Sequence, residues 1–142
     1  MPVNIFYNYS AFQTPPQNKL ISLTEFVLKQ ERKDPGQINI IFTDNEEIYS
    51  LNARYLDHHY YTDVISFYYS RSGPVEGDIF ISLDKVDENS KAYQTGYENE
   101  LIRVIIHGVL HLIGYTDKND DEKAHMHELE DQYLEYYNLN LP

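Results

Sequence analysis

The chain has 142 residues, the length of one domain, with 42% hydrophobic and 24% charged residues, values that are ordinary for a globular protein. It has no cysteine, which excludes a disulfide scaffold, an iron–sulfur cluster and a thiol nucleophile, so any metal must be bound by His, Asp or Glu. The 11 basic and 23 acidic residues give a net charge of −12, and the overall field of such a protein does not attract nucleic acid.

The pattern of apolar residues predicts strands and helices along the whole chain. In chain order we expect a strand at 3–8, a helix at 19–33, a strand at 37–42, a helix at 43–55, strands at 62–69 and 76–83, and helices at 86–95, 99–113 and 119–137. The two types mix without a strict alternation, which favours the α+β class. About four strands and four to five helices would form two layers around one core, in a single domain that spans residues 1–142.

Residues that commonly begin or end helices mark several of these elements. Ser22 and Glu25 have the spacing of a capping box near the start of the first helix. Gly96 would cap the helix at 86–95, and Gly114 would end the apolar helix at 99–113. The chain shows neither a signal-peptide pattern nor a run of about 20 apolar residues. We therefore expect a cytoplasmic protein that has no membrane partner.

Two histidines on the most apolar helix carry the clearest chemical signal. His107 and His111 are four residues apart, so on a helix both imidazoles lie on one face and can share a divalent ion. Gly114 permits a sharp turn, and Asp117 follows at the spacing of a third ligand. Three protein ligands leave a fourth position for water, as in catalytic zinc sites. The alternative is a pair of packed core histidines, but the Gly and Asp at ligand spacing favour a metal.

Position 108 argues against the simplest peptidase interpretation of these histidines. In zincins a glutamate follows the first histidine and acts as the general base, whereas this chain has Gly108 there. A metalloprotease-like hydrolase would need a base from another segment. Metal-assisted attack on a phosphoryl or carbonyl group remains open.

The segment 107–117, His-Gly-Val-Leu-His-Leu-Ile-Gly-Tyr-Thr-Asp, resembles the His-Gly-x-Leu-His-Leu-x-Gly-Tyr-Asp-His motif of the YbeY family of bacterial rRNA maturation factors. Segments around Leu51-Asn52-x-x-Tyr55, 62–67 and 77–81 follow the family's order, so the resemblance covers about residues 40–135. It implies an α+β fold with a mostly parallel sheet, a zinc site, and a single-strand-specific endoribonuclease of rRNA maturation and ribosome quality control. Single-stranded or ribosomal RNA and a ribosomal or ribosome-associated protein are the implied partners.

The third ligand departs from the family pattern, because Asp117 stands where the family usually has His, and Thr116 stands where it has Asp. Aspartate is a competent ligand, but it is harder than imidazole and adds a negative charge. It would therefore weaken the Lewis acidity of the ion and shift the metal preference towards harder ions. We expect one Zn²⁺, with another divalent transition metal such as nickel as the alternative.

The family's functional arginine departs as well. It usually follows the tyrosine matched by Tyr55, where this chain has Leu56. Arg54 is the nearest replacement and our candidate catalytic residue, with Arg71 and Arg103 as further candidates. An arginine near the metal would clamp a phosphate and offset its charge.

Other polar residues have simpler explanations. His58 and His59 lie in a polar segment that we expect to be exposed, and we interpret His125 and His127 as surface residues of the last helix. The acids at positions 63 and 78 are expected to be ordinary strand-edge residues. Glu128 could support a ligand histidine, but a solvated acidic face is the commoner explanation.

Three functions are therefore in view. The first is the zinc-dependent endoribonuclease that the resemblance implies, and the second is a metalloprotease-like hydrolase. The third is a metal-stabilised ribosome assembly factor that catalyses little itself. The displaced arginine and the acidic composition keep the third open, because RNA binding usually depends on Lys and Arg that neutralise phosphates.

Overall fold

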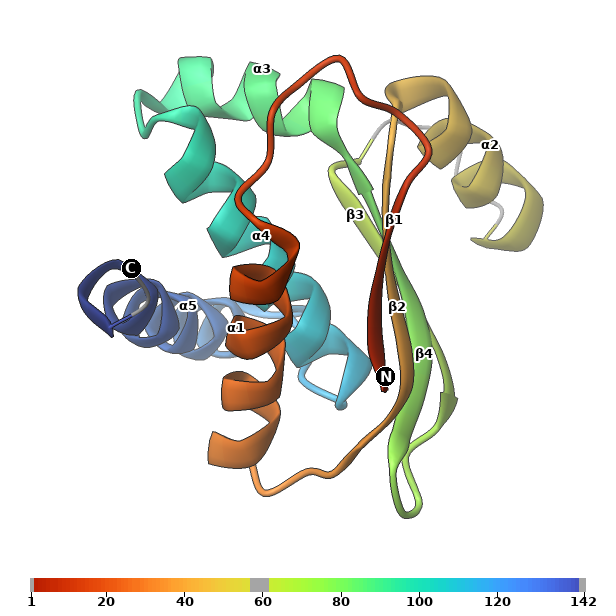
Figure 1. Ribbon diagram of the computed structural model, residues 1–142, viewed down its shortest axis with the longest axis vertical. Helices are drawn as coiled ribbons and strands as arrows, with labels where there is room; N and C mark the ends of the chain where they lie inside the picture. Colours follow the sequence, from red (N-terminus) through yellow and green to blue (C-terminus); the bar gives the residue numbers. More distant parts are fainter. Residues whose placement is uncertain (1, 57–61, 141–142) are drawn as a thin grey trace.

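A four-stranded mixed sheet forms the centre of the computed structural model (Figure 1), which describes residues 2–56 and 62–140. The strands are β1 (Val3–Tyr7), β2 (Pro35–Thr43), β3 (Val64–Ser70) and β4 (Val75–Ser82), in the spatial order β1-β2-β4-β3. β2 runs parallel to both β1 and β4, whereas β3 is antiparallel to β4. The expected mostly parallel sheet of four strands is thus confirmed.

The helices in the described residues are α1 (Gln17–Gln30), α2 (Asn45–Leu56), α3 (Leu83–Tyr93), α4 (Tyr97–Leu112) and α5 (Asp120–Asn140). Figure 1 shows α1, α4 and α5 on one side of the sheet and α2 on the other. The α+β class and the number of helices agree with the sequence-based expectation. None of these helices combines the length and the apolar character needed to span a bilayer.

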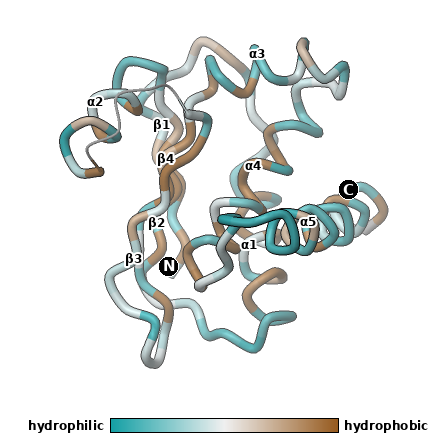
Figure 2. The backbone as a smooth tube through the Cα atoms, turned by 180° about the vertical axis from the view of Figure 1, so that it is seen from behind, coloured by the Kyte–Doolittle hydropathy of each residue, from teal (hydrophilic) through white to brown (hydrophobic). Residues whose placement is uncertain are grey.

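Helix α4 is the centre of the hydrophobic core. Ten of its residues are buried, and they pack between the sheet and the helices α1, α3 and α5. Figure 2 shows hydrophobic residues along the strands and α4, whereas α5 is largely hydrophilic. α5 contributes a narrow stripe that includes Met126, Tyr133 and Tyr137. Because α4 is fixed on every side, the side chains at its C-terminal end start from a rigid base.

Two predicted helix caps are wrong. α1 begins at Gln17 after Pro16, so Ser22 lies inside the helix, where its neighbours already satisfy the backbone N–H groups. Gln94 ends α3 in the left-handed conformation, and Gly96, with φ of 81°, precedes α4 instead of closing α3. Both errors arise because a local pattern does not show which of several polar residues the tertiary packing selects as the boundary.

Gly108 lets α4 approach the sheet closely. A Cβ atom at this position would lie 2.7 Å from Ile79 Cγ2 and 3.1 Å from Val64 Cγ2. Ser66 Oγ donates a hydrogen bond to the carbonyl oxygen of Gly108, at 2.8 Å, and ties the helix to β3. The position after the first histidine therefore faces the sheet and has no room for the glutamate of a zincin.

Replacing this glycine tests the close approach. We expect Gly108→Ala to lower the free energy of unfolding by about 1–3 kcal/mol, because overpacking outweighs the better helix propensity of alanine. Urea denaturation followed by circular dichroism measures the change. Glu128→Ala, on the exposed surface of α5, should stay within about 0.5 kcal/mol of the parent chain. A Gly108→Ala protein as stable as the parent would contradict the tight packing.

Candidate metal centre

Three side chains converge at the C-terminal end of α4. His107 and His111 come from the helix, and Asp117 comes from the segment that joins it to α5. The Oδ2 atom of Asp117 lies 3.6 Å from Nε2 of His107 and 3.5 Å from Nε2 of His111. One ligand atom from each residue lies within 4.8 Å of the others. The side chains are 25–40% exposed, so the centre is open to solvent on one side.

A regular helix ending brings Asp117 back towards the histidines. Gly114 adopts a φ of 115°, which favours glycine. The N–H of Tyr115 donates to the Leu110 carbonyl at 3.0 Å, and the N–H of Gly114 donates to the His111 carbonyl at 3.1 Å, the pair of bonds of a Schellman motif. This confirms the predicted role of Gly114 in ending the helix.

The same turn orients His111. Its Nδ1 lies 2.9 Å from the carbonyl oxygen of Tyr115, which can only accept a hydrogen bond. The proton therefore sits on Nδ1, and Nε2 offers its lone pair towards Asp117. A backbone carbonyl that fixes the tautomer in this way is a common partner of metal-binding histidines.

A buried carboxylate orients His107. Oε2 of Glu130, on α5, lies 2.5 Å from Nδ1 of His107, and the Glu130 residue is only 6% exposed. Arg103 donates to Oε1 of Glu130 at 3.1 Å and to Oδ1 of Asp131 at 2.6 Å. With Nδ1 donating to Glu130, Nε2 of His107 is also a free acceptor. Both rings thus present the atoms that a cation requires.

The pKa values of the two imidazoles are shifted in opposite directions. Burial alone would lower the pKa of His107, but the hydrogen bond and the charge of Glu130 outweigh it, and the net shift is upward. Burial lowers the pKa of His111, and the charge of His107 lowers it further. A cation must therefore displace a proton from His107 whenever the pH lies below the raised pKa, so metal binding weakens as the pH falls.

Side chains from both directions hold the segment that carries Asp117. The Tyr115 hydroxyl donates to Oε1 of Glu31 at 2.5 Å, and the Tyr133 hydroxyl donates to Oε2 of the same carboxylate. On the other side, Oε1 of Glu122 accepts from the Thr116 hydroxyl at 2.6 Å and from the N–H of Lys118 at 2.9 Å. Asp117 is therefore enclosed by anchored neighbours.

The three candidate arginines lie in different places. Arg71 donates to the carbonyl oxygens of Leu112 at 2.9 Å and His111 at 3.2 Å, and so caps the end of α4. Arg103 is engaged by its two carboxylate partners. Arg54 is exposed on α2, on the far side of the sheet, and donates to the Ser50 hydroxyl at 3.3 Å. The structure therefore brings together the three predicted ligands but does not place Arg54 beside them.

The expectations for the other histidines and for Glu128 have different outcomes. His125 and His127 are exposed on α5, as expected, whereas His58 and His59 lie outside the described residues. Glu128 is exposed, and the residue that supports His107 is Glu130 instead. A signal for Glu130 existed in the sequence, since it is the one acid in the buried stripe of α5 formed by Met126, Tyr133 and Tyr137.

One of the acids expected at a strand edge also has a different setting. Asp63 lines a cleft together with His107, and burial raises the pKa of its carboxyl group. The sequence around Asp63 did not predict this burial, because the cleft is formed by elements that are distant in the chain.

Comparison with known proteins gives a consistent result. A family model described as Endoribonuclease YbeY matches residues 8–138. The Endoribonuclease YbeY of Flavobacterium psychrophilum is 40% identical over 136 residues, which are 95% of this chain and 97% of that protein. The protein of the same name from Parabacteroides distasonis is 46% identical over 102 residues, 72% of each chain. The solution structure of TM1509 from Thermotoga maritima matches with a TM-score of 0.67 and 29% identity, covering 95% of this chain and 88% of that one.

The Glu130 carboxylate provides a direct test of the centre. We expect Glu130→Gln to weaken zinc binding by about 10- to 100-fold, because the neutral amide no longer raises the basicity of His107. Isothermal titration of the metal-free protein measures the affinity. The matched control is Glu128→Gln, an exposed residue on the same helix, which should bind zinc as the parent does. Equal affinities in both variants would contradict the role of Glu130.

Proposed function

Because the chain belongs to the YbeY endoribonuclease family, we propose that it cleaves single-stranded RNA during ribosomal RNA maturation and quality control. The observation that carries the proposal is the convergence of His107, His111 and Asp117 on one solvent-open point. A catalytic metal site needs this combination of a fixed ligand set and an accessible face.

We further propose Zn²⁺ as the resident ion, with nickel as the alternative. The donor set is two imidazole nitrogens and one carboxylate oxygen, each a usual zinc ligand. Both imidazoles have their second nitrogen satisfied, by Glu130 and by the Tyr115 carbonyl, so the ring orientations are already those that binding requires. The residues present therefore fit the ion.

When bound, a divalent ion would supply Lewis acidity at the scissile phosphate and lower the pKa of a water molecule there. The protein's own residues would hold the ion and orient the atoms that bind it. His107 and His111 direct their Nε2 atoms to one point. Glu130 accepts a hydrogen bond from Nδ1–H of His107 and would stabilise the positive charge that the ring gains when Nε2 binds a cation. Lys123 lines the small hollow next to His107 and Asp117, where its ammonium group can contact a phosphate.

Arg54 is our proposed counterpart of the family's functional arginine. It is exposed near the end of α2, on the opposite side of the sheet from the three candidate ligands, so it would bind the RNA strand away from the ion. Among the described residues its guanidinium group has no carboxylate partner, and it donates a hydrogen bond to the Ser50 hydroxyl. Arg71 and Arg103, in contrast, are already committed to partners within the fold.

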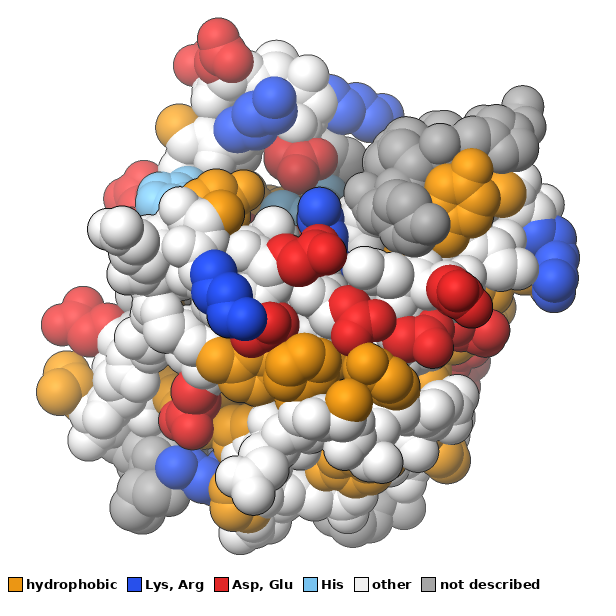
Figure 3. Space-filling view, turned by 90° about the horizontal axis from the view of Figure 1, so that it is seen from above, with side chains coloured by type: hydrophobic (Ala, Val, Ile, Leu, Met, Phe, Trp, Pro, Cys, Tyr) orange, Lys and Arg blue, Asp and Glu red, His pale blue; other side chains and the backbone are white. Residues whose placement is uncertain are grey.

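A non-catalytic assembly factor is the second candidate function, and the distribution of acidic side chains on the surface supports it. Figure 3 shows a face on which acidic side chains form a band while Lys and Arg are scattered. Such a face repels an RNA backbone and suits a basic ribosomal protein. We propose that a protein partner of this kind binds on the ribosome. The metalloprotease interpretation is weaker, because Gly108 faces the sheet and leaves the position of the general base without a side chain.

The metal ligands can be tested by content and activity together. We expect His111→Ala and Asp117→Ala to lose one equivalent of zinc, measured by mass spectrometry of the purified proteins. Cleavage of single-stranded RNA should fall at least about 100-fold in both, because the charge stabilisation at the phosphate is lost. Asp121→Ala, an exposed acid in the first turn of α5, is the control and should retain both. Full zinc content in the Asp117→Ala protein would overturn the assigned ligand set. Zinc loss without any cleavage by the parent chain would favour the assembly factor.

The two basic side chains can be separated by their effects on cleavage. We expect Arg54→Ala and Lys123→Ala each to lower kcat/KM by about tenfold. Lys123 would lose a contact to the phosphate at the metal centre, and Arg54 a contact to a phosphate further along the strand. Zinc content should be unchanged in both variants. Lys85→Ala, whose ammonium group is paired with Glu88 at 3.6 Å on α3, serves as a control for the general loss of positive charge. A parent-like rate for Arg54→Ala would exclude that residue from the reaction.

A further inference from the structure

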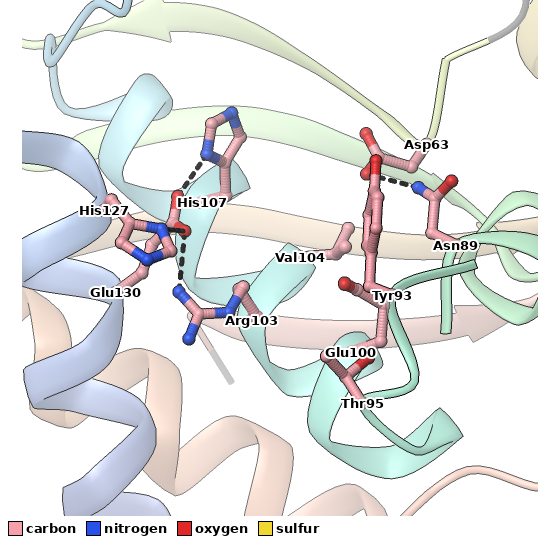
Figure 4. A pocket seen from close by; sticks show the side chains of 10 residues that line it. All are labelled: Asp63, Asn89, Tyr93, Thr95, Glu100, Arg103, Val104, His107, His127 and Glu130. Carbon is pink, nitrogen blue, oxygen red and sulfur yellow. Dashed lines mark hydrogen bonds and ion pairs between the residues drawn. The ribbon is translucent and has the colours of Figure 1, made fainter. Parts of the chain in front are cut away.

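A cleft of about 380 Å³ opens beside the metal centre, with His107 in its wall (Figure 4). Its volume is at the lower end of the range for sites that hold one small molecule. In Figure 4, His107 and Arg103 lie on one side of the cleft, and Asp63 and Tyr93 lie on the other. His107 also lines the hollow that contains Asp117. A group bound in the cleft would therefore be next to a phosphate placed at the metal.

Glu100 is the most informative residue of this cleft. It lies in the first turn of α4, lines the cleft and is only 6% exposed. Among the described residues no hydrogen bond or ion pair reaches its carboxyl group, and burial followed by the charge of Asp63 raises its pKa. A largely buried carboxyl group without a protein partner is stabilised when a ligand supplies hydrogen-bond donors.

Two further residues define the chemistry of the ligand. The aromatic ring of Tyr93 is 65% exposed and stands in the wall between Asp63 and Glu100 (Figure 4). An exposed tyrosine ring is a stacking surface for a nucleobase. The Asp63 carboxylate accepts from the Asn89 amide at a long 3.4 Å, which leaves it acceptor capacity towards the cleft. The site thus offers one flat surface and carboxyl groups that accept hydrogen bonds.

We propose that this cleft is a nucleobase subsite, in which Tyr93 stacks on a base next to the scissile phosphate and Glu100 reads its donor edge, with guanine preferred. The inference rests on the proposed RNA cleavage for its biological meaning. Guanine presents two adjacent donors, N1–H and the 2-amino group, to the two oxygens of a single carboxylate. Adenine and cytosine present one amino donor on the same edge, and uracil presents only N3–H.

The charge of the cleft supports a base in preference to a phosphate. Glu100, Asp63 and Glu130 line it, while the guanidinium group of Arg103 is already bonded to Glu130 and Asp131. Glu130 is paired with Arg103, but a phosphate group here would still be repelled by the carboxyl groups of Glu100 and Asp63. A neutral base with N–H groups would instead satisfy the buried acceptors, so the phosphate belongs at the metal and Lys123 side of His107.

Nucleotide titration of the purified chain tests the subsite without requiring cleavage. The probes are GMP, IMP and UMP, and IMP differs from GMP only by the missing 2-amino group. We expect GMP to bind about tenfold more tightly than IMP, since each well-placed base contact discriminates by about that factor. Equal affinities for the three nucleotides would overturn the proposal.

Two variants and one control locate the contact. Glu100→Gln should remove the preference of GMP over IMP, because the amide replaces one acceptor with a donor. Tyr93→Ala should weaken all three nucleotides by about tenfold through loss of stacking; the exposed side chain is not needed for folding. Glu98→Gln changes an exposed acid on the same helix turn and should leave every affinity unchanged. A GMP preference that survives in Glu100→Gln would exclude Glu100 as the reading residue.

Cleavage then separates this inference from the proposed function. The substrates are oligouridylate strands that carry a single G, I or A at a central position. Preferred cleavage next to G in the parent chain, lost in Glu100→Gln but not in Glu98→Gln, is the expected result. Equal cleavage of all the strands would overturn the proposed subsite but would still support the proposed nuclease activity. A chain that cuts none of the strands, yet prefers GMP in the titration, would retain the subsite and overturn the nuclease.

Discussion

The hydrogen bond between Glu130 and His107 is the interaction on which the site depends. It joins α5 to α4 through a carboxylate that is almost completely buried, and Arg103 neutralises the other oxygen of that carboxylate. A buried charge without its partners would cost about 3–5 kcal/mol. The three side chains are therefore stable only together. The bond fixes both the position of the ring and the nitrogen that carries the proton, so it orients His107 in the way that a metal ligand requires.

The same bond places His107 at the boundary of two spaces. On one side its Nε2 faces Asp117 in the metal centre, and on the other the ring forms part of the wall of the cleft. A change that rotates this ring would disturb ligand geometry and cleft shape at once. The packing of Gly108 against the sheet prevents such a rotation from the helix side, since α4 cannot withdraw from β3 and β4 without losing the Ser66 bond. The rigid packing of α4 in the core therefore fixes the positions of the side chains at the site.

The fold class and the convergence of the three candidate ligands could be predicted from the sequence, because both depend on short-range patterns. The four-residue spacing of His107 and His111, the glycine that must turn the chain, and Asp117 three residues later all act within one helix end. The roles of Glu130 and Asp63 were missed because they lie 23 and 44 positions from His107. Whether Glu130 bonds to His107, and whether Asp63 lines the same cleft, is decided by how α5 and β3 pack. The need for glycine at position 108 could not be predicted either, because it depends on how closely α4 packs against the sheet.

The acidic character of the chain acquires a specific meaning at the site. A nuclease that binds its substrate through many phosphates shows a steep loss of affinity with salt, and the net charge of −12 of this chain disfavours binding of that kind. With an ion bound at the candidate centre, the positive charge would be local, at the ion and Lys123, while the neighbouring cleft presents carboxyl groups as acceptors. Under the proposed function and the proposed subsite, selectivity would come from contacts to one base and from docking by a protein partner, and not from a strong general affinity for RNA. The negative charge that seemed to oppose a nuclease is therefore compatible with one that is brought to its substrate and reads it locally.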